Sequence, residues 1–105
     1  MEIEYMLKKI RFVLQANRCK KISQNELRKR MNGISGESTI SQLENTIIPE
    51  LNALIEQIHQ NNLPSKEKRF VLSFALAFRD WGWNIRTPTQ LFSALCALND
   101  MYQNL

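Results

Sequence analysis

Side chains that perform catalysis or hold metals are scarce in this chain of 105 residues. It has one histidine, His59, and two cysteines, Cys19 and Cys96, whose separation fits no metal-ligand or redox spacing. The sequence also lacks a glycine-rich phosphate loop, a nucleophile motif and a plausible pair of catalytic carboxylates. We therefore expect no catalytic residue, no metal and no cofactor, and we look for a function in binding.

The remaining cysteine and hydropathy signals indicate a cytoplasmic protein. Glu2 and Glu4 interrupt the first apolar residues, so no secretory signal is expected, and no stretch approaches the roughly 20 apolar residues of a membrane span. Reduced thiols fit that compartment. Cys96 lies in an apolar run and is predicted to be a small core residue, whereas His59 is predicted to be exposed.

Basic residues are concentrated in one part of the chain. Fourteen Lys and Arg against ten Asp and Glu give a net charge of +4. Residues 8–30 contain nine basic residues and one acid, Glu26, so this segment carries +8 and the rest of the chain −4. A local patch of this kind favours an anionic partner more than the net charge does. The nine are Lys8, Lys9, Arg11, Arg18, Lys20, Lys21, Arg28, Lys29 and Arg30.

The apolar residues recur at three- and four-residue spacings along the whole chain, and Gly and Pro are rare. The pattern predicts an all-α single domain, 1–105, in which five to six helices form a compact bundle. A helix-turn-helix-like part would cover 5–60 and an aromatic-rich part 65–105. The expected helices are 2–17, 24–31, 38–46, 49–61, 65–81 and 88–105, with a connection at 18–21.

Two of these helix boundaries are predicted from capping boxes. In a capping box, the side chain of the N-cap residue and that of the residue three positions later each accept a hydrogen bond from the other residue's backbone amide. Ser23 with Glu26 is predicted to start the second helix, and Thr87 with Gln90 the last one, with Pro88 in its first turn. Ser38 or Glu37 is predicted to start the third helix.

Apolar stripes indicate which side of each helix faces the core. The predicted stripes comprise Ile3, Met6, Leu7, Ile10, Val13 and Leu14; Leu27 and Met31; Ile40, Leu43, Ile47, Leu51, Leu54 and Ile58; and Leu91, Leu95, Leu98, Tyr102 and Leu105. Pro49 interrupts the third stripe, and a proline inside a helix costs about 3 kcal/mol. We therefore prefer two helices there over a single kinked one.

Glycines and aromatic residues mark the other boundaries. Asn32-Gly33 and Gly36 predict a turn, and Gly82 is predicted to end the helix before it. Phe70, Phe74 and Phe78 recur on one helix face and are expected mainly in the core. The corner Trp81-Gly82-Trp83 cannot bury both indoles on one side, so Trp81 and Trp83 are candidate partner-binding residues.

Residues 22–46 resemble the helix-turn-helix of the lambda-repressor-like (Xre-type) DNA-binding family. The matching residues are Ser23, Gln24 and Leu27 in the first helix, Gly33, Ile34 and Ser35 in the turn, and Ser38, Thr39, Ile40, Ser41, Leu43 and Glu44 in the recognition helix. The resemblance extends over about residues 5–60. It departs from the family at Arg28, where the family favours Ala, and in a turn that is about two residues longer.

The resemblance implies a small DNA-binding transcriptional regulator that reads the major groove of double-stranded DNA with polar side chains and holds phosphates with basic ones. The candidate DNA-binding residues are Lys20, Lys21, Gln24, Arg28, Lys29, Arg30, Ser38, Thr39, Ser41, Gln42 and Asn45. In this interpretation the aromatic C-terminal part forms a homodimer. The alternative is a helical protein-interaction module, such as an immunity protein, antitoxin, anti-defence inhibitor or adaptor, that binds an acidic patch on a protein partner.

Overall fold

The computed structural model describes residues 2–105, and its longest element spans almost the whole molecule. This helix, α1 (Glu2–Met31), has 30 residues, or about 45 Å at 1.5 Å per residue. The long axis of the molecule measures 47 Å. The predicted division of this segment into helices 2–17 and 24–31 is therefore wrong.

Helix α1 continues through 18–21 because its buried face does so. Ala16, Cys19 and Ser23 are fully buried at spacings of three and four residues, and Arg and Lys are good helix formers. Ser23 therefore lies inside the helix, and its hydroxyl has no hydrogen-bond partner among residues 2–105. The prediction that Ser23, together with Glu26 three residues later, caps the start of a helix is therefore wrong.

The buried face of α1 is not the one that its large apolar residues predict. Phe12 is fully buried, but Ile10 is 49% exposed and Leu14 is 64% exposed. Leu27 is half-buried and Met31 is exposed. Apart from Phe12, the fully buried side chains of α1 are small, and small side chains allow neighbouring helices to approach closely. The predicted inward stripe of 2–17 is thus largely on the outside.

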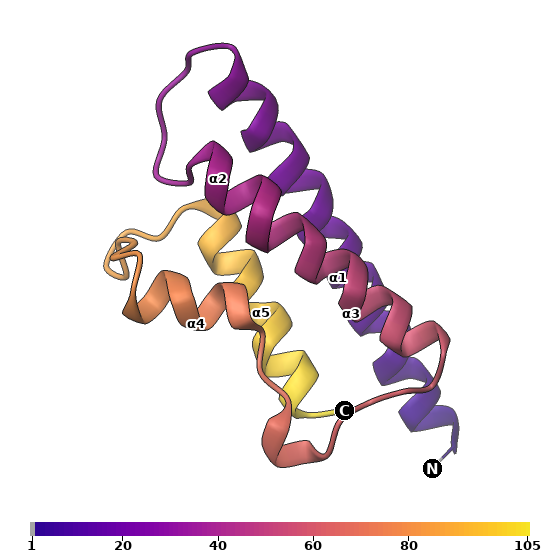
Figure 1. The fold of residues 1–105 in the computed structure, drawn as a ribbon. Helices are drawn as coiled ribbons and strands as arrows, with labels where there is room; N and C mark the ends of the chain where they lie inside the picture. The colour runs from indigo at the N-terminus through magenta and orange to yellow at the C-terminus, as the bar shows by residue number, and fades with distance from the viewer. Residues whose placement is uncertain (1) are drawn as a thin grey trace.

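After the turn at 32–39 the chain returns antiparallel to α1 (Figure 1). α2 (Ile40–Gln42), the π-helical turn η1 (Leu43–Ile47) and α3 (Ile48–His59) follow one another without a break in helical backbone. Pro49 has no N–H to donate, and in the preceding π turn the N–H of Ile48 bonds the carbonyl of Leu43. The preferred division into two helices is wrong, and the single-helix alternative is confirmed.

The second half begins later than predicted. A short 3-10 turn, η2 (Lys66–Lys68), and extended residues precede α4 (Leu72–Arg79), so the helix does not start at Ser65. It ends before Gly82, which has a φ of +67° as a chain reversal requires. α5 (Gln90–Gln103) begins after Thr89, whose hydroxyl accepts from the N–H of Phe92 at 3.1 Å. The cap is therefore Thr89 and not Thr87.

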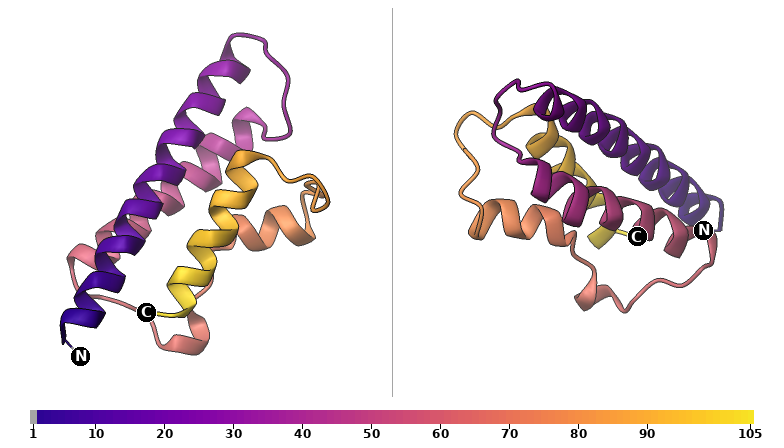
Figure 2. Two further views of the ribbon diagram at one scale, coloured as in Figure 1. Left: turned by 180° about the vertical axis from the view of Figure 1, so that it is seen from behind. Right: turned by 45° about the horizontal axis from the view of Figure 1, so that its top comes forward.

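Helix α1 packs against both α3 and α5, and α5 also runs antiparallel to α1 (Figures 1 and 2). α4 crosses α5 on the side of the molecule away from α1, and α5 is its main helical neighbour. Tyr102 of α5 donates to Gln57 of α3 at 2.9 Å and stacks on Phe12 of α1, with ring centroids 5.3 Å apart. These contacts join the three longer helical segments around one core.

The described residues are all-helical, with no strand, as the sequence predicts, but they form four helical segments and not five or six. The two other apolar stripes are confirmed as core: Leu43, Ile47, Leu51, Leu54 and Ile58 are buried on one, and Leu91, Leu95, Leu98 and Tyr102 on the other. Ile40 is an exception at 40% exposed. No helix within residues 2–105 has the length and apolar character needed to cross a membrane.

Candidate functional site

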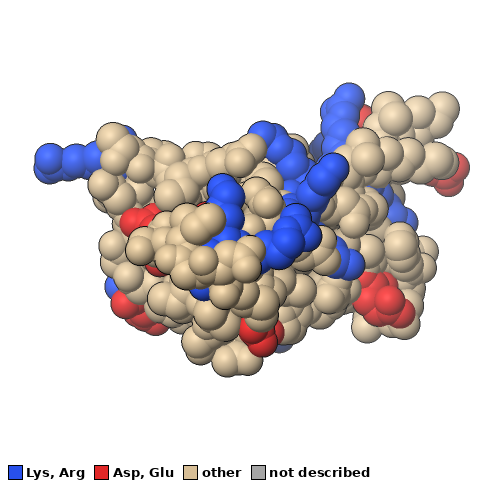
Figure 3. Space-filling model, turned by 90° about the horizontal axis from the view of Figure 1, so that it is seen from above, with Lys and Arg blue, Asp and Glu red and all other residues tan. Residues whose placement is uncertain are grey.

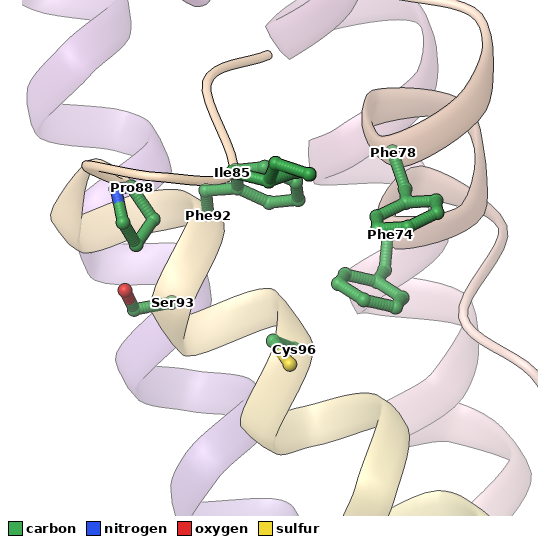
Figure 4. Close-up of a pocket in the computed structure, with 7 residues that line it drawn as sticks. All are labelled: Phe74, Phe78, Ile85, Pro88, Phe92, Ser93 and Cys96. Carbon is green, nitrogen blue, oxygen red and sulfur yellow. The ribbon is translucent and has the colours of Figure 1, made fainter. Parts of the chain in front are cut away.

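An apolar pocket of about 330 Å³ opens between α4, α5 and the loop that joins them (Figure 4). Its lining comes from all three: Phe74 and Phe78 on α4, Ile85 and Pro88 in the loop, and Phe92, Ser93 and Cys96 on α5. Only Ser93 in this set carries a hydroxyl, so the lining offers contact area and very few hydrogen bonds.

Aromatic rings form both the inside and the rim of this pocket. Phe92 is 3% exposed, and its ring centroid lies 5.8 Å from that of Phe74. Phe74 in turn lies 6.1 Å from Phe78, which stands one helical turn further along α4 and is 53% exposed. Ile85 on the loop is 60% exposed. The rim is thus made of side chains that water normally drives into a core.

A second depression, of about 540 Å³, shares Phe74 and Phe78 with the first and extends to Phe70 and Leu72. Phe70 is 52% exposed and Leu72 is 44% exposed. We call the set Phe70, Leu72, Phe78 and Ile85, with the two depressions between them, the α4 surface. Contiguous apolar surface of this kind usually marks a binding site.

The orientation of α4 is set by a carboxylate from another helix. The N-terminal amides of a helix have no partners within it and attract negative charge. Here Glu50 of α3 accepts from the backbone N–H groups of Leu72 and Ser73, the latter at 2.7 Å. Asn99 of α5 accepts from the N–H of Val71 at 2.8 Å. Both neighbours therefore hold the start of α4.

The corner Trp81-Gly82-Trp83 contacts the first pocket from the core side, through Phe92. Trp83 is 4% exposed and packs edge-on against Phe92, with centroids 5.5 Å apart. Trp81 is half-buried and lies 5.6 Å from Trp83. In the C-terminal half, the exposed aromatic side chains are Phe70 and Phe78, not an indole of the corner. The four-residue spacing of Phe70, Phe74 and Phe78 is visible in the sequence, but it suggests burial because the predicted helix is too long.

The two cysteines occupy opposite environments. Cys19 is fully buried in α1, and burial raises the pKa of its thiol to about 12. Cys96 is exposed beside the pocket, which corrects its prediction as a core residue. Partial burial and the nearby carboxylate of Asp100 raise the pKa of the Cys96 thiol. The residues on either side of Cys96 in the core stripe of α5 are Leu95 and Leu98, and Cys96 projects to a different side.

Arg30, one of the candidate DNA-binding residues, holds the loop between α1 and α2. Its guanidinium donates to the carbonyl of Ser38 at 2.7 Å and to Glu26 at 2.7 Å, with a longer bond to the carbonyl of Ile34. The side chain of Arg30 is 9% exposed. Burial acts to raise the pKa of Glu26, but hydrogen bonds from Arg30 and Lys29 lower it on balance.

The polar residues of the predicted recognition helix are also engaged within the chain. Ser38 is 4% exposed, so it is not free to reach a base edge. Thr39 caps α2 in a reciprocal capping box with Gln42, which corrects the predicted start at Ser38 or Glu37. Ser41 and Asn45 are exposed and bond each other at 3.2 Å. The long turn and antiparallel helices differ from the short turn and crossed helices of a helix-turn-helix.

The other candidate DNA-binding residues lie on the C-terminal half of α1. Lys21, Gln24 and Arg28 are exposed, Lys20 is half-buried, and Lys29 pairs with Glu26 at 3.2 Å. Figure 3 shows Lys and Arg side chains gathered at the centre of one face, with acidic residues towards its edges. Of the basic candidates on α1, Arg30 contacts the polar segment 38–45, through Ser38.

Comparison with known protein families, curated proteins and solved structures finds no match to this chain. Within residues 2–105, no three His, Cys, Asp or Glu side chains lie close enough to hold a metal ion.

Proposed function

We propose that this protein is a helical interaction module that binds a protein partner through the α4 surface. The observation that carries the proposal is the half-exposure of Phe70, Leu72, Phe78 and Ile85 around two adjoining depressions. Aromatic side chains at the centre of an apolar surface are the usual source of binding energy in protein complexes. The held orientation of α4 lowers the entropic cost of binding, because the surface is already formed.

Charges around the α4 surface define the partner's chemistry. Arg79 borders the second depression together with Asp80, and Arg86 follows Ile85 in the loop. Segment 65–86 has five basic and two acidic residues, so its balance is +3. A partner segment with apolar side chains flanked by Asp or Glu complements this surface. Such charges accelerate association and select partners more than they strengthen binding.

The experiment uses the exposed thiol beside the pocket. A photoreactive maleimide attached to Cys96 should cross-link the partner when cell extract is illuminated, and mass spectrometry should map the link to an apolar segment with acidic residues. Phe78→Asp should reduce the cross-link at least about tenfold, because a charge replaces an aromatic contact. The matched control is Ile34→Asp, since Ile34 is 55% exposed but lies in the α1–α2 loop.

Two results would contradict the proposal. One is an equally strong cross-link in the folded Phe78→Asp protein and in wild type. The other is a link that maps only to the chain itself or to nucleic acid. Circular dichroism and the unfolding midpoint of each variant establish that it is folded before binding is compared.

A second candidate, binding to double-stranded DNA, is favoured by one observation. Arg18, Lys21 and Arg28 are exposed on α1 and have no ion-pair partner among residues 2–105. Unpaired cations on one helix face suit a row of phosphates. Because Arg30 and Ser38 are engaged in the loop, this proposal relies on phosphate contacts and not on base reading.

Fluorescence anisotropy with a labelled duplex tests the second candidate. Binding should weaken as salt rises, and Lys21→Ala with Arg28→Ala should flatten the log–log salt dependence by about two, one for each lost phosphate contact. Lys66→Ala with Lys68→Ala, which removes the same charge from η2, is the control. Absence of duplex binding at low salt excludes this candidate.

A further inference from the structure

The outer side of α1 carries a seam of apolar residues that stay exposed in the fold. Ile3, Leu7, Ile10 and Leu14 follow one another at spacings of four, three and four residues, which aligns them along one side of the helix. They are 71%, 44%, 49% and 64% exposed, respectively. We call these four residues the outer seam.

The outer seam differs from ordinary surface residues in being continuous and in facing away from the core. Phe12, Ala16 and Cys19, which are fully buried, occupy the opposite side of α1. A depression of about 370 Å³ between Met6, Ile10, Leu14 and the end of α3 widens the apolar area beside the seam. The N-terminal half of α1 therefore has two apolar sides, of which its own fold covers only one.

The seam ends abruptly at Leu14. The next positions in the same three-and-four rhythm are Asn17, Lys21, Gln24 and Arg28, all exposed. A parallel pair of such helices would place Lys21 opposite Lys21 and Arg28 opposite Arg28, and like charges facing each other oppose pairing. In an antiparallel pair that overlaps only along the seam, these residues extend past the end of the other helix.

Acidic and basic residues beside the seam fit the antiparallel arrangement. Antiparallel overlap puts Ile3 against Leu14 of the second copy and Leu7 against its Ile10. In that register Glu4 approaches Arg11 of the second copy, and twofold symmetry repeats the pair. Glu4 and Arg11 are exposed, and neither has an ion-pair partner among residues 2–105.

We propose that two copies of this chain associate through the outer seams of their α1 helices, antiparallel and in the register that pairs Glu4 with Arg11. α1 and α4 lie on opposite sides of the molecule (Figure 2), so the dimer leaves both α4 surfaces open. This surface differs from the aromatic C-terminal part that the sequence suggested for dimerisation. The interface is small, and we expect a dissociation constant on the order of 10 μM.

Sedimentation over a concentration series tests the dimer. Wild type should shift from monomer to dimer, and Ile10→Asp should weaken association at least about tenfold, since the change occurs twice in each interface. Ile34→Asp is the matched control, because Ile34 has similar exposure but lies in the α1–α2 loop. Neither substitution removes a buried side chain, so at protein concentrations well below the dissociation constant both variants should keep the wild-type unfolding midpoint.

A charge exchange tests the orientation. Glu4→Lys or Arg11→Glu alone should raise the dissociation constant about tenfold, because two attractive pairs become repulsive, and the double variant should recover to within about threefold of wild type. Arg18→Glu, at a position beyond the overlap, should have little effect. A wild type that stays monomeric at millimolar concentration, an Ile10→Asp variant that still dimerises, or a double variant that does not recover would each overturn the proposal.

The same measurements separate this inference from the proposed function. Phe78→Asp should abolish partner cross-linking and leave the dimer intact, whereas Ile10→Asp should do the reverse. A dimer that is lost in Phe78→Asp but retained in Ile10→Asp would mean that the α4 surface, and not α1, is the interface between copies.

Discussion

At the scale of single residues, Arg30 shows how one side chain can determine a loop. Its guanidinium links the end of α1 to Ser38, and it packs directly over Gly36. A Cβ added at Gly36 would lie 1.8 Å from the Arg30 Nη2 atom. The absence of a side chain at Gly36 leaves room for the guanidinium, and a Cβ there would displace the guanidinium from its present position.

We expect Gly36→Ala to lower the free energy of unfolding by about 1–2 kcal/mol, because it displaces the guanidinium from its acceptors. In an Arg30→Ala background the same change should cost much less, since the clash is gone. Urea unfolding of the four proteins in this double-mutant cycle measures the coupling. Ser35→Ala, an exposed position in the same loop, is the control. Fully additive effects would contradict the contact.

The buried thiol of Cys19 predicts a dependence of stability on pH. Its folded pKa of about 12 is above the ordinary thiol value of 9.0, so the folded state retains a proton that the unfolded state releases. This contribution is fully present below pH 9 and is lost as pH rises from 9 towards 12, with a slope of up to about 1.4 kcal/mol per pH unit.

Urea unfolding of wild type and Cys19→Ala between pH 8 and 10.5 checks this expectation. Burial also raises the pKa of Tyr102, which acts in the same direction, so the difference between the two proteins isolates the thiol. Wild type should lose stability faster than Cys19→Ala above pH 9. Parallel pH profiles would show that the Cys19 thiol is not protected in the folded state.

At the scale of elements, predictability follows the size of the buried side chains. The stripe from Leu43 to Ile58 and the stripe of α5 consist of large apolar residues, and both were identified correctly. On α1 the buried side chains are mostly small, while the large ones face outwards. A rule that assigns the larger apolar residues to the core therefore selected the wrong side of α1.

The start of α4 could not be predicted for a different physical reason. Its cap is not local: the carboxylate comes from Glu50, which lies 22 residues before Leu72. From the local sequence alone, Ser65 is the capping residue upstream, and the helix is predicted to begin there. Because the helix boundary was predicted wrongly, the candidate site was not predicted either. With α4 beginning at Leu72, Phe70 lies in the extended segment before the helix and Phe78 lies near the C-terminal end of the helix.

We expect Glu50→Gln to lower the free energy of unfolding by about 1 kcal/mol, because a neutral amide interacts less strongly with the helix N-terminus. The amides of Leu72 and Ser73 should exchange hydrogen faster. Glu56→Gln is the control on the same helix, since Glu56 is exposed and only accepts from the side chain of Gln60. Unchanged exchange at Ser73 would contradict the capping role.

At the scale of the whole molecule, α1 joins the structure and α4 is peripheral to it. α1 packs against α3 and α5 along most of its length, whereas α4 has eight residues and lies mainly against α5. Local opening free energy follows the extent of packing. Among the four helical segments, α4, which carries the candidate site, is therefore the one least supported by the rest of the fold.

Native-state hydrogen exchange should show this order directly. Amides of α4 should exchange through local opening, at low denaturant and with little dependence on it, while the central amides of α1 around Ala16 should require global unfolding. A bound partner should slow exchange in α4 and leave α1 unchanged. Equal protection of α4 and the centre of α1 would contradict a peripheral α4.

The contrast between the two cysteines gives the native chain two chemical reporters. Cys96 lies open beside Phe78 and should react with a thiol reagent at once, whereas Cys19, at 0% exposure, should react only when α1 separates from its neighbours. A partner bound to the α4 surface should slow only the reaction of Cys96, and a stabilising substitution should slow only the reaction of Cys19. The reaction rate of Cys96 thus reports occupancy of the α4 surface, and the reaction rate of Cys19 reports opening of the core, both in one unlabelled protein.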